Sequence, residues 1–251
     1  MKPRPSFPAR LSDTPTPVKR SIQAPQIARS NSLDSSALRA NLVDKLRAEG
    51  VSDRFVLNAI GRVERHRFVD SALVNQAYED TSLPIGLGQT ISKPSVVARM
   101  AELLRAGSPG PLGRVLEIGT GCGYQAAVLS QLATEVYSIE RLRGLHDKAR
   151  DNLRHLALHN VHLLLGDGML GYAKGAPYAA IIAAAGGDAL PQAWVDQLAV
   201  GGRLIAPVSG YSGKGPRAGQ QSLVVVLKTA SGVSHTVLEA VHFVPLKSGV
   251  A

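Results

Sequence analysis

The stretch RVLEIGTGCGYQAAVLSQL, residues 114–132, decides the fold of this chain. Its β-branched and aliphatic start predicts a strand, three glycines then interrupt the pattern, and alanines and leucines recur beyond them at helical spacing. A strand joined to a helix by a tight glycine turn forms a cradle. The glycines leave room for a ligand, and the helix N-terminus presents unpaired N–H groups to it. We therefore expect a nucleotide or cofactor site that includes Gly119, Thr120 and Gly121.

The spacing of the glycines indicates the kind of ligand. Positions 119, 121 and 123 read G-x-G-x-G, whereas the dinucleotide fingerprint reads G-x-G-x-x-G. Tyr124 stands where the third glycine of that fingerprint belongs. Glu117, at the end of the strand, suits a ligand with positive charge better than a pyrophosphate. This combination resembles the first motif of the Rossmann-like methyltransferases that use S-adenosylmethionine.

Length, composition and charge set the broad class. The 251 residues, 45% of them hydrophobic, are enough for one α/β domain with an appendage, and no apolar run is long enough to cross a membrane. The lone cysteine, Cys122, excludes an internal disulfide and a multi-cysteine zinc site, so we expect a cytoplasmic protein without a metal. Residues 1–35 hold six basic and two acidic residues of a chain with net charge +9. Charge divided in this way argues only weakly for a nucleic-acid partner, and we expect none.

The chain divides into a tail and one domain. Residues 1–35 combine closely spaced prolines with serines and basic residues, which predicts a disordered tail. An organelle transit peptide shares this composition, but the prolines would break the amphipathic helix that such a peptide needs. Residues 36–251 read as a single domain. Within it, residues 36–110 supply N-terminal helices and an active-site loop, and residues 111–251 supply the cofactor-binding sheet.

The first part of that domain is helical. One helix is predicted from Ser36, with Gly50 as its C-terminal cap, and a second from Ser52. Their inward residues are predicted to be Leu38, Leu42, Val43 and Leu46 in the first helix, and Phe55, Val56, Ile60 and Val63 in the second. A short helix is expected around residues 72–77. An irregular loop should follow from Leu83 to Pro94, where a further helix begins.

The second part alternates strands with helices, which predicts a largely parallel, doubly wound sheet of about seven strands. After the opening strand, 115–118, we expect strands at 136–139, 161–165, 179–183, 203–208, 223–227 and 237–244. Helices are expected at 142–158 and around Trp194. The last two strands lack a helix between them and should form a hairpin at one edge of the sheet.

Acidic residues stand at the ends of the first three strands: Glu117, Glu140 and Asp167. Ligands of an open parallel sheet lie across the carboxyl ends of its strands, so Glu140 is placed to accept hydrogen bonds from both ribose hydroxyls. Asp167 and Gly168 should lie beside the adenine. The alternatives are that Glu140 only begins a helix and that Gly-Asp-Gly, residues 166–168, is an ordinary turn.

The cysteine and the histidines do not indicate a nucleophile or a metal site. Cys122 has no sequence neighbour that would lower the pKa of its thiol, so it is a poor candidate for a nucleophile. His155 and His159 lie four residues apart but lack a third metal ligand. No hydrolase G-x-S-x-G elbow or phosphate-binding G-x-x-x-x-G-K-[ST] loop is present, which counts against hydrolases and NTPases.

A family resemblance joins these motifs. In chain order they are Arg67-Phe68-Val69, Ala77-Tyr78-x-Asp80, LPIGLGQTISKP from Leu83, VLEIGTGCGYQAAVLS from Val115, Glu140-Arg141, Gly166-Asp167-Gly168, Gly201-Gly202-Arg203-Leu204 and Phe243-Val244-Pro245-Leu246. Together they resemble the protein-L-isoaspartate (D-aspartate) O-methyltransferases from about residue 36 onward. The LPIGxGQTIS stretch is the discriminating one. The chain departs from the family after the fourth strand, where Ala183-Ala184-Ala185-Gly186-Gly187 replaces a Thr-Ala-Ala run followed by prolines.

The resemblance implies methyl transfer from S-adenosylmethionine to the free α-carboxylate of L-isoaspartyl and D-aspartyl residues in damaged proteins. The methyl ester then cyclises to a succinimide, whose hydrolysis returns part of the material to normal aspartyl links. The resemblance also makes Ser92 the catalytic serine, and it adds Thr90, Ile91 and Arg141 to the cofactor site. By its position, Ser92 is equally a candidate N-cap for the next helix.

We expect the protein to be a monomer that acts on damaged proteins and peptides. Two other functions stay open. A methyltransferase of the same class that acts on another acceptor would fit the departure after the fourth strand. A non-enzymatic module that binds S-adenosylmethionine or protein would keep the cradle but lack methyl transfer. The intact QTIS segment, residues 89–92, argues against both.

Overall fold

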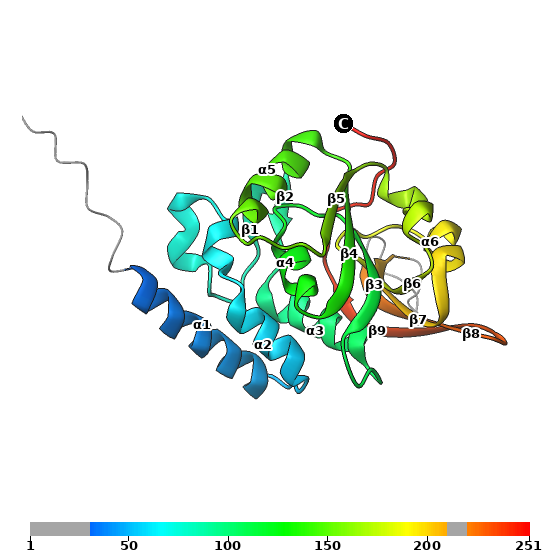
Figure 1. Cartoon of the computed structure of the whole chain (residues 1–251), viewed down its shortest axis with the longest axis horizontal. Helices are drawn as coiled ribbons and strands as arrows, with labels where there is room; N and C mark the ends of the chain where they lie inside the picture. Colours follow the sequence, from blue (N-terminus) through cyan, green and yellow to red (C-terminus); the bar gives the residue numbers. More distant parts are fainter. Residues whose placement is uncertain (1–30, 210–219) are drawn as a thin grey trace, which may run out of the picture.

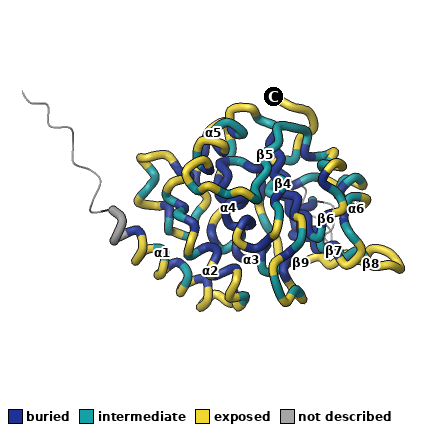
Figure 2. Tube along the Cα trace, viewed as in Figure 1, coloured by how far each residue is buried: buried dark blue, intermediate teal, exposed yellow. Residues whose placement is uncertain are grey.

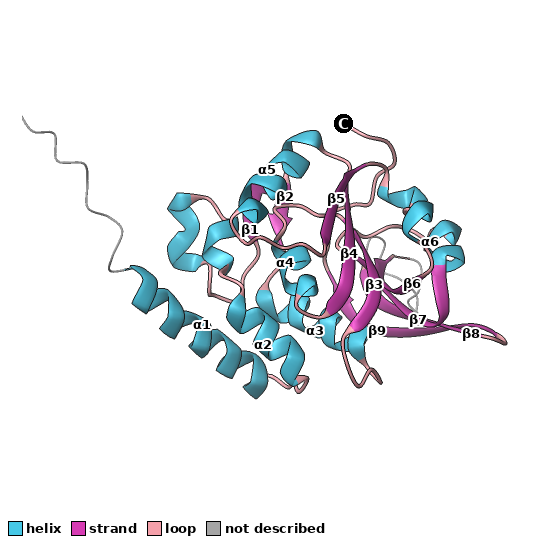
Figure 3. Ribbon diagram, in the orientation of Figure 1, coloured by secondary structure: helices cyan, strands magenta, loops and turns pink. Residues whose placement is uncertain are grey.

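The computed structural model describes residues 31–209 and 220–251, with side chains from residue 35, and its centre is a seven-stranded sheet (Figures 1 and 3). The strands of this sheet are β3 (Leu112–Ile118), β4 (Ala133–Glu140), β5 (Val161–Leu165), β6 (Tyr178–Ala183), β7 (Leu198–Val208), β8 (Gln221–Thr229) and β9 (Gly232–Val241). Their order across the sheet is β5-β4-β3-β6-β7-β8-β9. The five strands from β5 to β7 are parallel, and β7, β8 and β9 pair antiparallel. The prediction of a largely parallel sheet with a hairpin at one edge is confirmed.

Helices cover both faces of the sheet. On one face, Met100 and Leu104 of α3 (Pro94–Arg105) and Leu129 of α4 (Tyr124–Ser130) pack against β3 and β4. On the other face, the buried Trp194 of α6 (Gln192–Gln197) packs against β6 and β7. Helix α5 (Arg143–Arg154) contacts β4 and β5. Figure 2 shows the dark, buried chain concentrated in the sheet and in the helix faces turned toward it. The doubly wound architecture is confirmed.

The N-terminal helices differ in detail from the prediction. Helix α1 (Asn31–Ala48) begins five residues before Ser36, because its first turns lack the apolar spacing from which the start was predicted. Gly50 ends the helix in a left-handed conformation, with φ of +103°, as predicted. Leu38 is exposed, and so is Phe55 of α2 (Arg54–Arg62), against the prediction. The ring of Phe55 instead contacts two guanidinium groups, those of Arg54 and Arg105, at 5.0 and 4.6 Å from its centre.

The predicted irregular loop after Leu83 is a regular element. Strands β1 (Leu83–Gly86) and β2 (Gln89–Ile91) form a two-stranded antiparallel hairpin of their own. Its glycines, Gly86 and Gly88, have φ of +99° and +69°, so they make the turn rather than break the structure. Lys148 of α5 fastens the hairpin, because its ammonium donates to the carbonyl of Ile85 at 2.8 Å.

Several boundaries also move. The 3-10 helix η2 (Ser71–Gln76) occupies the region of the expected short helix, and another, η1 (Arg65–Phe68), precedes it. Two more, η3 (Gly168–Leu170) and η4 (Ala173–Gly175), follow β5. Strand β9 ends at Val241, so residues 242–244 leave the sheet instead of continuing it. The bulk of the predicted tail, residues 1–30, lies outside the described residues. No helix of the described chain is long and apolar enough to cross a membrane.

Candidate active site

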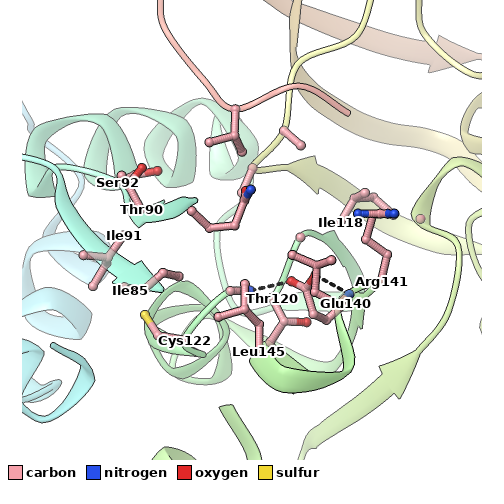
Figure 4. A pocket seen from close by; sticks show the side chains of 18 of the residues that line it. Ile85, Thr90, Ile91, Ser92, Ile118, Thr120, Cys122, Glu140, Arg141 and Leu145 are labelled. Atoms are coloured by element: carbon pink, nitrogen blue, oxygen red, sulfur yellow. Dashed lines mark hydrogen bonds between the residues drawn. The ribbon is translucent and has the colours of Figure 1, made fainter. Parts of the chain in front are cut away.

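A cavity of about 520 Å³ lies over the carboxyl ends of β3 and β4, where the parallel-sheet rule places a ligand. Of the predicted site residues, the cavity wall contains Thr90, Ile91, Ser92, Gly119, Thr120, Gly121, Glu140, Arg141 and Gly168. Figure 4 shows Ser92 and Thr90 on one side of the cavity and Arg141 on the other, with Glu140 near Thr120. Glu117 and Asp167 are not part of this wall. The fold therefore brings nine of the eleven predicted residues around one space.

The glycine turn shapes the cavity by what it lacks. Gly119 and Gly121 have φ of +90° and +57°, and a side chain on Gly121 would meet Ile85 of the hairpin at 3.2 Å. The amide groups of Gly119 and Thr120 both donate to the carbonyl of Ile139, and that of Gly123 donates to Thr120. These N–H groups therefore stabilise the turn itself. The sequence had predicted that N–H groups here would face a ligand. Because Gly119 and Gly121 have no side chains, the turn leaves space in the cavity for a bulky adenosyl group.

Glu140 is the acidic group in the wall of the cavity. Its side chain is only 5% exposed, and its two oxygens accept from backbone N–H groups, one from Gly121 and one from Leu142, each at 2.9 Å. The carboxylate thus joins the glycine turn to the start of α5. Glu140 does begin a helix, as the alternative stated, but it also holds the glycine turn. Each carboxylate oxygen can accept a second hydrogen bond, which leaves capacity for a ribose diol.

Glu117 lies beneath the cavity, fully buried. Ser138 donates a 2.5 Å hydrogen bond to one of its oxygens, and Thr120, which lines the cavity, is hydrogen-bonded to Ser138 at 2.6 Å. The other oxygen, Oε1, has no hydrogen-bond partner among the described residues. Burial raises the pKa of Glu117 to about 8, although the Ser138 hydrogen bond acts in the opposite direction. Glu117 therefore reaches the site indirectly, through Ser138 and Thr120.

This raised pKa predicts a pH-dependent stability. Between the unfolded pKa of 4.5 and the folded pKa of about 8, the folded state binds one proton more than the unfolded state. Stability from this group is present at low pH and is lost as the pH rises toward 8, by about 1.4 kcal/mol for each pH unit. We expect Glu117→Gln to gain stability on the parent by that amount per unit from pH 5.5 to 7.5. Urea unfolding of both proteins measures it, and a constant difference would mean that Glu117 is ionised throughout.

Ser92 follows the hairpin and precedes α3. The N-cap position of α3 belongs to Lys93, whose side chain makes no capping hydrogen bond. Asp80 supplies the cap from elsewhere in the chain: its two oxygens accept from the amide and the hydroxyl of Ser95, at 2.7 and 2.8 Å. The N-cap alternative for Ser92 is therefore wrong. Ser92 instead lines the cavity, one residue before the N-cap.

Asp167 and Arg141 both hold the end of the chain. One oxygen of Asp167 accepts from the amide of Met169 at 2.8 Å, as in an ordinary turn, and the other accepts from the amide of Gly249 at 2.7 Å. Arg141 donates to the carbonyl of Gly249 at 3.0 Å. Gly168, between these groups, lines the cavity and accepts from the indole N–H of Trp194.

A second cavity, of about 750 Å³, adjoins the first. The two share Thr90, Ser92, Ala184 and Val244, so they meet at the predicted catalytic serine. The second cavity runs between the exposed side of α3 and the end of β9. Arg99 of α3 and Glu239 of β9 form a 3.1 Å ion pair there. One cavity has the glycine turn and the other opens along a strand edge, and Ser92 lies at their junction.

Some residues of the site escaped the sequence analysis. Leu87, Leu246 and Lys247 also line the cavity, and Lys148 and Asp80 position the hairpin and α3 from a distance. Leu87, Asp80 and Leu246 stand inside motifs quoted above, which gave them no individual role, and Lys148 and Lys247 gave no signal. Cys122 is buried, and burial raises the pKa of its thiol to about 11, which agrees with the prediction that it is no nucleophile.

The comparison with known families shows which family the chain belongs to. A profile described as protein-L-isoaspartate(D-aspartate) O-methyltransferase (PCMT) matches residues 37–251. The chain belongs to this family. A protein-L-isoaspartate O-methyltransferase of Leptothrix cholodnii is 56% identical over 252 residues, which cover 99% of this chain and 85% of that protein. One from Methylibium petroleiphilum is 53% identical over 268 residues, covering 99% and 97%.

Solved structures agree. A structure titled protein-L-isoaspartate O-methyltransferase has a TM-score of 0.74 and 29% identity, covering 84% of this chain and 67% of its own. A putative family member from Plasmodium falciparum, solved with S-adenosyl-L-homocysteine, has a TM-score of 0.69 at 24% identity, over 83% and 98% of the two chains, and shows the shared fold. The match of the family profile starts at residue 37, within α1, so it takes in the helices, the hairpin and the sheet together.

Proposed function

We propose that this chain is a protein-repair enzyme that transfers a methyl group from S-adenosylmethionine to the free α-carboxylate of L-isoaspartyl and D-aspartyl residues in damaged proteins. The observation that carries the proposal is the junction of two cavities at Ser92, one over the glycine turn and one along a sheet edge. A methyl donor in the first cavity and a polypeptide in the second would meet at that point. The family match over residues 37–251 supports the same reaction.

The reaction needs alignment more than acid–base chemistry. When bound, the cofactor supplies an electrophilic methyl group on a sulfonium. An acceptor carboxyl with a reference pKa near 4 is ionised at pH 7, so no general base has to remove a proton. Alignment of the reacting atoms contributes up to about 7–11 kcal/mol. We assign the Ser92 hydroxyl to orienting the acceptor carboxylate, and the second cavity to the residues that flank it.

The cofactor roles follow from the positions in the first cavity. Glu140 would accept from the ribose hydroxyls, while Gly119, Thr120 and Gly121 give the adenosyl group its space. Thr90 and Ile91 face the same cavity from the hairpin and would cover the cofactor near its methyl group. Glu117 would act indirectly, through Ser138 and Thr120, since it is not part of the wall.

A labelled-methyl assay tests the proposal. We expect an isoaspartyl peptide to be labelled and its aspartyl twin of the same sequence to stay unlabelled. Equal labelling of the two would favour a methyltransferase with another acceptor. Binding of S-adenosylhomocysteine without labelling of either peptide or of aged protein would favour the non-enzymatic module.

The domain boundary gives a further prediction. We propose that the catalytic domain needs nothing before Asn31, where α1 begins, since the family match starts at residue 37. Deletion of residues 1–30 should leave turnover of the isoaspartyl peptide within about twofold and the unfolding midpoint nearly unchanged. Thermal unfolding and the labelling assay measure both. A midpoint lower by several degrees would show that the deleted segment packs on the domain.

We propose also that the enzyme acts as a monomer in the cytoplasm and on protein rather than on nucleic acid. The support is a lone, buried cysteine, which fits a reducing compartment. Sedimentation analysis tests the monomer, cell fractionation tests the compartment, and a binding assay with nucleic acid tests the third statement.

A further inference from the structure

Residues 243–251, here called the strap, leave β9 and cross the carboxyl ends of the sheet strands. Gln221 holds the start of the strap: it accepts from the amide of Phe243 at 2.7 Å and donates to the carbonyl of the same residue. Gly186 holds the middle, since its amide donates to Val244 and its carbonyl accepts from Leu246. In Figure 1 the strap is the red segment that ends at the top of the molecule, near β5 and α5.

The far part of the strap is tied down by groups from β4, α5 and the turn after β5. The backbone of Ala251 accepts from the amide of Arg143 at 2.8 Å and donates to the carbonyl of Arg141 at 2.9 Å. Gly249 is bound on both of its backbone groups: the Arg141 side chain donates to its carbonyl, and the Asp167 carboxylate accepts from its amide. Gly249 has φ of +79°, which glycine adopts without strain.

The strap borders the end of the cavity where the adenine should bind. Glu140, the proposed ribose acceptor, ends β4, so the adenine lies beyond it toward Gly168 at the end of β5. Arg141, Gly168 and Lys247 of the strap all line that end of the cavity. Asp167 does not line it, and both of its oxygens already accept backbone hydrogen bonds.

We propose that the strap closes the adenine end of the cofactor cavity, with Lys247 in the wall and residues 248–251 as its anchor. Asp167 and Arg141, which bind Gly249, are then positioning residues that hold this wall closed. The proposal rests on the cofactor site assigned above. It differs from the expectation that Asp167 binds the adenine amine directly. Charge-assisted hydrogen bonds to the backbone are strong enough for this task, and asparagine in place of Asp167 offers only one acceptor oxygen for two N–H groups.

A double-mutant cycle tests the proposal by calorimetric titration with S-adenosylhomocysteine. We expect Asp167→Asn to weaken binding about 5- to 10-fold, and removal of residues 248–251 to weaken it by a similar factor. Asp167→Asn in the shortened chain should add no further loss. Losses that multiply would overturn the proposal, and so would full affinity after the removal. Asp151→Asn, an exposed acid on α5 that pairs with Arg154, is the matched control and should leave binding unchanged.

Two additions keep the test decisive. If the shortened chain does not fold, Gly249→Pro in the full chain replaces it in the cycle: proline lacks the N–H donor and cannot adopt φ of +79°, so it releases this part of the strap. S-inosylhomocysteine, which lacks the adenine amine, is the second probe. If Asp167 only positions the strap, Asp167→Asn should weaken both ligands by the same factor; a loss confined to the adenosyl ligand would assign Asp167 to the amine.

These measurements use binding alone, so they are separable from the proposed reaction. Failure of isoaspartyl labelling with the expected binding cycle would overturn the acceptor and leave the strap in place. Absence of S-adenosylhomocysteine binding by the unchanged protein would overturn the cofactor site and the strap proposal together.

Discussion

Ser92→Ala should lower turnover of an isoaspartyl peptide by 10-fold or more, about 1.4 kcal/mol or above in activation free energy. The hydroxyl lies where the two cavities meet, and it is the group assigned to orienting the acceptor carboxylate. Affinity for S-adenosylhomocysteine should stay close to that of the parent. Stability should also be unchanged, because the start of α3 is capped by Asp80 and not by Ser92.

Two further variants separate catalysis from capping. Asp80→Asn keeps the size of the side chain but weakens the charge-assisted hydrogen bonds to Ser95, so it should cost about 1 kcal/mol of stability. Ser92→Asp sets a negative charge against the incoming carboxylate, and we expect it to fold, bind cofactor and be nearly inactive. Steady-state kinetics with urea unfolding measure these effects. A Ser92→Asp enzyme with normal turnover would remove Ser92 from the active site.

The sequence was sufficient to predict the architecture because its signals are local and strong. Strand, glycine turn and helix at residues 114–132, followed by repeated strand and helix patterns, leave a parallel sheet as the economical arrangement. The carboxyl-end rule then placed Glu140 and the glycine turn in one cavity, as observed. The hairpin after Leu83 was missed because its glycines read as breakers, although at positive φ they are what the turn requires.

The sequence could not show which distant side chains form hydrogen bonds with backbone N–H groups. The cap of α3 comes from Asp80, fifteen residues before Ser95, and the acceptor for Gly249 comes from Asp167, at the end of a strand far earlier in the chain. Glu117 was read as a ligand of a positively charged cofactor because it stands one residue before the end of its strand. Strand alternation instead turns it into the interior, where Ser138 meets it.

Glu140→Ala should weaken S-adenosylhomocysteine binding by about 1.5–3 kcal/mol, which is more than 10-fold. Two losses combine. The ribose hydroxyls lose a charged acceptor, and the amide of Gly121 loses the oxygen that holds the glycine turn against β4. The second loss distinguishes Glu140 from an acid that only begins a helix. Removal of such an acid would leave the shape of the glycine turn unchanged.

Comparing cofactor fragments apportions the two losses. Methylthioadenosine keeps the ribose diol and adenine but lacks the amino-acid end, whereas its 2′-deoxy analogue removes one hydroxyl. If Glu140 binds the diol, the parent should discriminate between these two ligands by several-fold, and Glu140→Ala should discriminate little. Glu140→Gln, which retains one acceptor oxygen, should lie between them because it can serve Gly121 or a hydroxyl. Equal discrimination by all three proteins would limit Glu140 to joining the turn and α5, and the ribose would need another acceptor in the cavity wall.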